Sequence, residues 1–158
     1  MDEDLIEYCK KLKQKYSILN SEEKEFIKKT VKANYVRKDA KTSFSFFDIL
    51  DYSDMSGINI PDAWRWIKDF VANKEIIVFF NEGAAKEYIK LYHGGIFVDF
   101  YDESPLVEFY ITDCAVSFLL GYNHSQCLFA FGTAGDWLEN DNRYKRYQKI
   151  KRQKAKKE

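Results

Sequence analysis

Three side chains that could bind a metal ion or take part in catalysis lie close together in the most hydrophobic part of the chain: Cys114, His124 and Cys127. A structural zinc site needs four ligands at characteristic spacing, and Asp113 is the one further candidate beside them. A catalytic cysteine needs a neighbouring base and a lowered thiol pKa, whereas Cys127 begins an apolar run. Residues 122–126, which separate two strand-like runs, are instead typical of a hairpin turn. We therefore expect a structural hairpin here, with no metal, no cofactor and no catalytic group.

Other candidate residues also have structural explanations. His93 could act as an acid or base, but it precedes two glycines and fits the last turn of a helix, where a histidine meets the helix dipole. Trp64 and Trp66 could stack on a ligand, but their spacing on a helix points them to different sides, and Trp66 is the more exposed. No pair of carboxylates is marked by its spacing for acid–base work. We expect the protein not to be an enzyme, and catalysis through Cys127, His124 and His93 stays open as an alternative.

Length and composition indicate a single domain with a substantial core. The chain has 158 residues, of which 46% are hydrophobic and 17% aromatic. It contains no run of about 18 apolar residues, and it begins with acidic residues where a secretory signal would carry positive charge. Three cysteines, an odd number, suit free thiols in a reducing compartment. These features predict a cytoplasmic protein that does not associate with a membrane.

The formal net charge is zero, but charge is segregated along the chain. Residues 1–90 contain 16 basic and 16 acidic residues, whereas residues 91–142 contain eight acidic residues and no Lys or Arg. The segment 143–158 has nine basic residues against Glu158 alone. We expect residues 1–142 to form one α+β domain and residues 143–158 a basic C-terminal helix or tail.

Apolar residues recur at three- and four-residue spacing in the N-terminal half, as an amphipathic helix requires. Asn20 or Ser21 would cap the second helix, which we expect to be an antiparallel neighbour of the first, and Pro61 fits the first turn of the third. Residues 36–58 show no clear period, and the part from 44 to 52 reads as either a short helix or an extended piece. The expected helices are residues 4–19, 20–35, 59–74 and 82–95, followed by a closing helix that begins at 133–140 with Thr133 as its cap.

The second half of the chain shows the period of two that is typical of strands. The segment "DESPL", residues 102–106, would supply one of the turns. Helices first and strands second indicate an α+β fold, with N-terminal helices packed on an antiparallel β-meander of about five strands and a C-terminal helix. The expected strands are residues 75–80, 96–102, 107–113, 115–122 and 127–132.

Alternation in the segments 96–102 and 107–113 predicts a candidate binding surface. Their apolar side chains would face the core, and the intervening side chains would point away from it. Tyrosines beside acids suit a protein interface, although ordinary solvated strand faces, or faces covered by a helix, are the other interpretations. With the acids of the following turn, the candidate partner-binding residues are Asp99, Tyr101, Asp102, Glu103, Glu108 and Tyr110.

The segments "DAWRWIKDF", "EIIVFF", "VEFYITD", "FLLGYNHSQCLFAFG" and "GDWLE" resemble the C-terminal half of small bacterial proteins of the toxin-immunity type. The resemblance covers roughly residues 62–139. It implies a helical N-terminal part that precedes a sheet, and stoichiometric binding of a cognate toxin. It carries over no catalytic residue.

The expected function is therefore that of a non-enzymatic, protein-binding module: a bacterial immunity protein that binds and neutralises a cognate toxin. Toxin nucleases expose basic surfaces to hold phosphate, so an acidic, aromatic surface would complement such a partner. The alternative is a nucleic-acid-binding module, in which the tail neutralises phosphates while Tyr144 and Tyr147 stack on bases. The basic residues of the tail are Arg143, Lys145, Arg146, Lys149, Lys151, Arg152, Lys154, Lys156 and Lys157.

Overall fold

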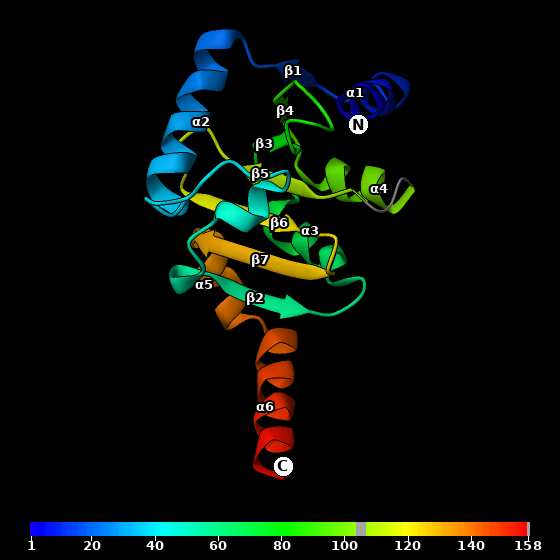
Figure 1. The fold of residues 1–158 in the computed structure, drawn as a ribbon. Helices are drawn as coiled ribbons and strands as arrows, with labels where there is room; N and C mark the ends of the chain where they lie inside the picture. The colour runs from blue at the N-terminus through cyan, green and yellow to red at the C-terminus, as the bar shows by residue number, and fades with distance from the viewer. Residues whose placement is uncertain (104–106, 158) are drawn as a thin grey trace.

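A computed structural model describes residues 1–103 and 107–157, which form one antiparallel sheet with helices on both of its faces (Figure 1). The strands are β1 (Tyr16–Ile18), β2 (Ser56–Asn59), β3 (Ile76–Phe79), β4 (Ile89–Leu91), β5 (Phe109–Thr112), β6 (Phe118–Tyr122) and β7 (Cys127–Gly132). Their order across the sheet is β1-β4-β3-β5-β6-β7-β2, with every neighbouring pair antiparallel. The α+β class is thus confirmed. The described sheet has seven strands rather than five, because short strands from the N-terminal half pair with both of its edges.

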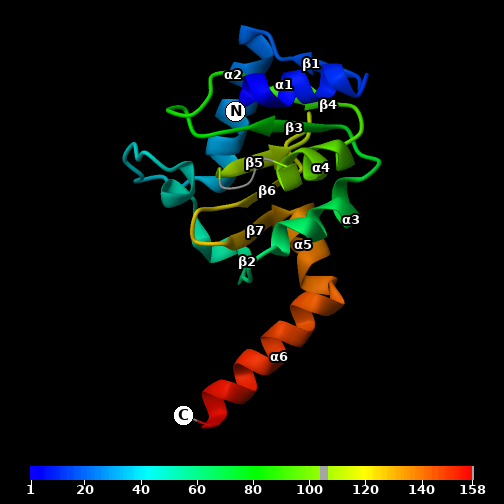
Figure 2. The same cartoon turned by 90° about the vertical axis from the view of Figure 1, so that its right-hand side faces the viewer.

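The α-helices are α1 (Asp2–Lys11), α2 (Ser21–Tyr35), α3 (Ile67–Val71), α4 (Gly95–Glu103), α5 (Thr133–Asn140) and α6 (Asn142–Lys157). Three short 3₁₀ helices accompany them: η1 (Phe46–Ile49), η2 (Tyr52–Asp54) and η3 (Ala63–Trp66). Helices α1, α3, α4 and α5 cover one face of the sheet, here the first face, and α1, α3 and α4 lie toward the viewer in Figure 2. Helix α2 and the segment 36–55 cover the opposite, second face.

Both faces of the central strands are apolar, so each strand contributes to two cores. In β3, Ile76 and Val78 pack on the first face, whereas Ile77 and Phe79 pack on the second. Successive strand residues point to opposite faces, and a helix layer on each side buries both sets. As a consequence, side chains that alternate with core residues are not turned to solvent here.

Several sequence expectations are confirmed. Helix α2 begins after Asn20, whose side-chain oxygen accepts a hydrogen bond from the Glu23 amide at 2.9 Å, while the Glu23 carboxylate accepts from the Asn20 amide at 3.0 Å. Strands β3, β5, β6 and β7 lie within the ranges predicted for them. Helix α5 also lies where it was expected, although Gly132, not Thr133, occupies its cap position.

The expected N-terminal helix pair is wrong in two respects. Helix α1 ends at Lys11, because the chain turns at Lys13, whose φ is +54°, and continues into β1 at Tyr16. Furthermore, α1 and α2 are not antiparallel neighbours. Leu5 of α1 belongs to the core of the first face, and Ile27 of α2 to that of the second.

The segments 82–95 and 96–102 exchange the structures predicted for them. The first contains strand β4, and the second lies within helix α4, where Phe97, Phe100 and Tyr101 are buried at helical spacing. His93 therefore lies between a strand and a helix rather than in a last helical turn. Of the turn expected at residues 102–106, residues 104–106 lie outside the described part of the chain.

The third expected helix is shorter than predicted. Residues 63–71 form η3 and α3, whereas Pro61 precedes both and Asp62 adopts a φ of +66° before η3 begins. Within the described residues, no helix is both long and apolar enough to cross a bilayer.

The C-terminal helix α6 leaves the body of the protein and points away from the sheet (Figures 1 and 2). Tyr144 is its buried residue, and residues 149–157 are all exposed. Its first turn is held to α3 by Arg143, which forms an ion pair with Asp69 at 2.8 Å and lies 4.8 Å from the ring centre of Trp66. Trp66, which we expected to be the more exposed of the two tryptophans, is thus partly covered by the start of α6.

Candidate functional site

The structure separates the six residues of the expected binding surface into two groups. Tyr101, Glu108 and Tyr110 are buried, with exposed fractions of 4%, 7% and 0%. The prediction that alternation turns them outward is wrong, for two different reasons. Tyr101 belongs to a helix and packs against Trp64, whereas Tyr110 belongs to a central strand whose second face is covered by η1.

The other three residues, Asp99, Asp102 and Glu103, lie at the surface on α4. The carboxylate of Asp99 accepts a hydrogen bond from Lys68 at 2.7 Å, and that of Asp102 pairs with Arg65 at 2.7 Å. All four paired side chains are between 44% and 53% exposed. Solvent therefore screens these two ion pairs, and each charged group can readily change its partner.

Helix α1 extends this acidic surface. Tyr8 of α1 packs edge-on against Phe100 of α4, with ring centres 5.5 Å apart. Partial burial raises the pKa of the Tyr8 phenol, and the nearby carboxylates of Glu103 and Asp99 raise it further. Asp4 precedes Tyr8 by one turn on the same side of α1. The acidic patch comprises Asp4, Tyr8, Asp99, Asp102 and Glu103.

The α1 part of the acidic patch was missed because the N-terminal acids were interpreted only as evidence against a signal peptide. The first helical turn contains Asp2, Glu3 and Asp4, and this concentration of charge was the available signal. The contact between Tyr8 and Phe100 joins segments far apart in the chain, which no local pattern could reveal.

A second polar arrangement surrounds the buried carboxylate of Glu108. Its Oε2 accepts hydrogen bonds from Ser45 at 2.7 Å, from the Asn81 amide at 2.8 Å and from the Tyr110 hydroxyl at 3.0 Å. Its Oε1 lies against Nδ1 of His124 and accepts a hydrogen bond from the His124 backbone amide at 3.3 Å. Burial acts to raise the pKa of Glu108, but hydrogen bonds from Asn81, Ser45 and His124 outweigh it and lower the pKa to about 2.

This carboxylate–histidine pair opens to solvent through the imidazole, since the His124 side chain is 68% exposed. A carboxylate that orients a histidine is one component of nucleophilic catalysis, but the structure does not bring His124 and Cys127 together as such a pair. Burial raises the pKa of the Cys127 thiol, which is the opposite of activation, and its Sγ lies 3.7 Å from the Leu128 carbonyl oxygen.

The hairpin between β6 and β7 is confirmed. The Asn123 side chain accepts hydrogen bonds from the backbone amides of Ser125, at 2.9 Å, and Cys127, at 3.0 Å. Cys114 is exposed outside this turn. Across residues 1–103 and 107–157, no cluster of three or more His, Cys, Asp or Glu side chains is arranged to hold a metal ion.

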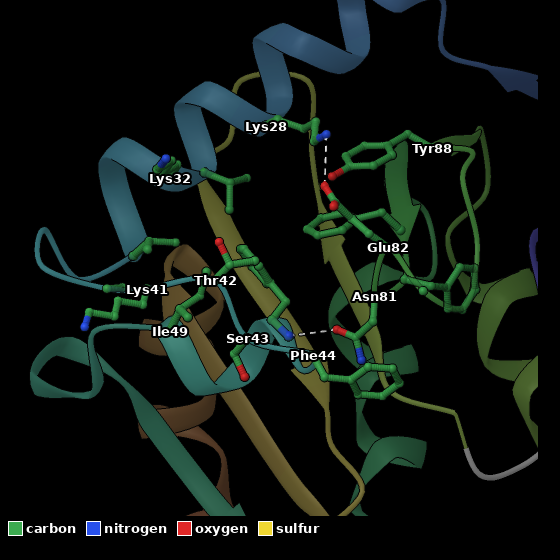
Figure 3. A pocket seen from close by; sticks show the side chains of 17 residues that line it. Lys28, Lys32, Lys41, Thr42, Ser43, Phe44, Ile49, Asn81, Glu82 and Tyr88 are labelled. Atoms are coloured by element: carbon green, nitrogen blue, oxygen red, sulfur yellow. Dashed lines mark hydrogen bonds and ion pairs between the residues drawn. The ribbon is translucent and has the colours of Figure 1, made fainter.

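A pocket of about 420 Å³ opens on the second face, between α2, the segment 36–49 and the chain that joins β3 to β4 (Figure 3). Its apolar lining includes Val31, Val36, Ile49, Phe79 and Tyr88, and three of its polar lining residues are Lys28, Lys32 and Lys41. The sequence did not indicate this pocket, because one wall is the aperiodic segment for which no structure could be assigned.

The chain matches no protein-family model, no curated protein and no solved structure.

Proposed function

We propose that this protein is a non-enzymatic binding module of the toxin-immunity type, which holds a basic partner protein on the acidic patch of α1 and α4. A half-buried tyrosine surrounded by carboxylates carries the proposal. Partial burial raises the pKa of the Tyr8 phenol, the nearby carboxylates of Glu103 and Asp99 raise it further, and its ring packs edge-on against Phe100. Aromatic anchors contribute much of the binding energy at protein interfaces, and acidic surroundings favour a basic partner.

The cations on this surface are compatible with such a partner. Asp4 contacts the N-terminal ammonium at 3.6 Å, while Asp99 and Asp102 contact Lys68 and Arg65. Exposed pairs of this kind contribute at most about 1 kcal/mol, so Arg or Lys side chains of a partner can replace them. A cytoplasmic location remains part of the proposal.

Affinity capture from the native host, followed by purification of the identified partner, tests the proposal. We expect an equimolar complex whose association rate falls as salt rises, because exposed charges are screened over about 10 Å at 0.1 M. The double substitution Asp102→Lys and Glu103→Lys should lower the association rate about tenfold. The matched control is Glu25→Lys with Asp54→Lys, which makes the same charge change at exposed positions on the second face.

Two results would contradict the acidic-patch proposal. One is a partner whose affinity stays within about threefold of the unsubstituted value in the α4 double variant. The other is an equal loss of association rate in both double variants, which would show that only net charge matters.

The projecting helix α6 favours a second candidate function, the binding of nucleic acid. Residues 149–157 are exposed, and the segment 143–157 contains nine basic residues, a concentration suited to phosphate. A helix that is exposed over residues 149–157 has little intrinsic stability in water, so a bound polyanion would stabilise it. Of the two aromatic residues expected to stack on bases, Tyr144 is buried, which leaves the half-buried Tyr147.

A further inference from the structure

We propose that the pocket beneath α2 is a binding site for an amphipathic carboxylate, a small molecule with an apolar chain and one anionic head group. The proposal is independent of the acidic patch, which lies on α1 and α4 over the first face of the sheet, whereas this pocket opens on the second.

The interior of the pocket suits an apolar chain. Four segments of the chain contribute apolar side chains to one hollow. Val31 belongs to α2, Val36 directly follows α2, Ile49 belongs to η1 and Phe79 belongs to β3. Covering apolar surface of this kind contributes about 25 cal/mol per Å². A volume of about 420 Å³ falls in the range of small-molecule sites and is too small for a docked helix, whose diameter alone is about 10–12 Å.

The opening of the pocket is basic. Lys28 and Lys32 lie one turn apart on α2, Lys41 belongs to the segment that follows α2, and all three line the pocket; the Lys28 ammonium lies beside Glu82 (Figure 3). Lys24, one turn earlier on α2, places its ammonium 5.5 Å from the ring centre of Tyr88. This positive charge at the mouth of an apolar hollow complements an anionic head group.

Two of these ammonium groups are available to a ligand without loss of an ion pair within the described part of the chain. Among the described residues, Lys32 and Lys41 take part in no ion pair, whereas Lys28 contacts Glu82 at 3.1 Å. Glu82 is 82% exposed, so a ligand carboxylate can take its place on Lys28 at little cost. Glu82 is thus the residue that competes with an anionic ligand.

The hydroxyl of Tyr88 points toward the same opening (Figure 3). Burial raises the pKa of this phenol, and the Glu82 and Glu25 carboxylates raise it further, so it stays protonated. A protonated hydroxyl can donate a hydrogen bond to a carboxylate beside Lys28, which would fix the position of the head group.

Phe44 supplies an unusual exposed wall. Phe44 is 85% exposed, and its ring edge lies 3.3 Å from the position that a Cβ would occupy on Gly83, which also lines the pocket. A large aromatic ring held in solvent beside an apolar pocket is a feature of ligand sites, since a bound chain would cover it.

Calorimetric titration of the full-length protein with dodecanoate, below the concentration at which this soap forms micelles, tests the proposal. Methyl dodecanoate is the matched probe without the charge. We expect saturable binding of one dodecanoate per protein, and binding of the methyl ester at least tenfold weaker. The triple variant Lys28→Gln, Lys32→Gln and Lys41→Gln should bind dodecanoate at least tenfold more weakly, and Phe44→Ala about threefold more weakly.

The substitution Glu82→Gln should have the opposite effect, because it releases Lys28, and should tighten dodecanoate binding about threefold. The control triple variant is Lys11→Gln, Lys29→Gln and Lys154→Gln, which removes the same charge from exposed positions that do not line the pocket, and should leave binding unchanged. Thermal melting of every variant shows that it is folded.

Three results would overturn the proposal: equal affinity for dodecanoate and its methyl ester, an unchanged affinity in the pocket triple variant, or equal weakening in both triple variants. Absence of dodecanoate binding, together with saturation by an acidic peptide that carries one phenylalanine, would also overturn it. In that case the pocket would be a docking site for a protein segment.

Discussion

The imidazole Nδ1 of His124 lies against the carboxylate oxygen Oε1 of Glu108, and this contact ties the turn between β6 and β7 to the residue that precedes β5. The other carboxylate oxygen, Oε2, accepts hydrogen bonds from Ser45, which precedes η1, and from Asn81, which follows β3. One buried charge therefore holds together four segments on the second face of the sheet. Removing it leaves several buried donors without their acceptor.

We predict that Glu108→Gln destabilises the protein at neutral pH and weakens its acid sensitivity. The folded pKa of Glu108 is about 2, below the ordinary value of 4.5, so the ionised carboxylate stabilises the fold above pH 4.5. This contribution is lost as the pH falls from about 4.5 to about 2. A pKa difference of this size corresponds to roughly 3 kcal/mol of unfolding free energy.

Urea unfolding of the wild-type protein and Glu108→Gln between pH 7 and pH 3 measures the effect. The difference in unfolding free energy between them should shrink as the pH falls. Glu103→Gln, an exposed carboxylate variant on α4, should follow the wild-type curve at every pH. If the unfolding free energies of the wild type and Glu108→Gln differed by the same amount at every pH, ionisation of Glu108 would not stabilise the fold as predicted.

Local signals explain which elements could be predicted from the sequence. Helix α2 has a side-chain cap and a stripe of buried residues, and both act over a few positions. Strands β3, β6 and β7 lie in nearly continuous apolar runs, and β5 lies in a segment where apolar and other side chains alternate; either pattern acts over a few positions. These elements were found because their neighbours in sequence already determine them.

The segment 96–102 shows where local signals fail. Ile96, Val98 and Phe100 alternate as in a strand, whereas Phe97, Phe100 and Tyr101 follow the spacing of a helix. The tertiary structure decides between the two periods: a Cβ on Gly94 would lie 2.5 Å from the Val71 carbonyl oxygen, so the chain passes close to α3 before α4 begins. Nothing within the segment itself contains this information.

The candidate sites were predictable only in part, for the same reason. Asp99, Asp102 and Glu103 do lie at the surface, although on helix α4 rather than on a strand and its turn. Glu108 was assigned to the surface because it alternates with the apolar residues of the segment 107–113, but its burial depends on donors such as Asn81 from distant segments. The pocket depends on the aperiodic segment 36–49, whose backbone is determined by contacts with α2 and β3.

We predict that one of the three thiols reacts rapidly in the native protein. Cys114 is exposed, whereas Cys9 and Cys127 are buried, and burial raises the pKa of both buried thiols. Titration with Ellman's reagent should therefore show one fast thiol before unfolding and all three after it. In Cys114→Ser the fast phase should disappear. A fast phase that persists in this variant would show that Cys9 or Cys127 opens readily to solvent.

The last prediction concerns the unequal roles of the two ends of α6. Tyr144 is 6% exposed and belongs to the core of the first face, and its hydroxyl lies 3.4 Å from the Glu139 carboxylate. Replacing it with Ala should cost about 3 kcal/mol of unfolding free energy, the usual scale for removing a buried aromatic ring. Truncation after Ile150 removes residues that are exposed throughout 151–157, so it should change the unfolding free energy by less than about 0.5 kcal/mol.

The same truncated protein separates the structural role of α6 from a functional one. It lacks Lys151, Arg152, Lys154, Lys156 and Lys157 but keeps the anchor of Arg143 on Asp69. If the tail binds nucleic acid, titration of a fluorescein-labelled single-stranded DNA should give a salt-dependent affinity. Truncation should lower this affinity at least tenfold, because it removes phosphate contacts, and it should also make the dependence on salt less steep. Because truncation also removes Glu158, its matched control changes four lysines on other surfaces to Gln: Lys10, Lys11, Lys13 and Lys29. Equal DNA affinity in the full-length and truncated proteins would contradict a nucleic-acid role for α6. A loss of more than about 2 kcal/mol of unfolding free energy on truncation would show that residues 151–157 pack as part of the fold.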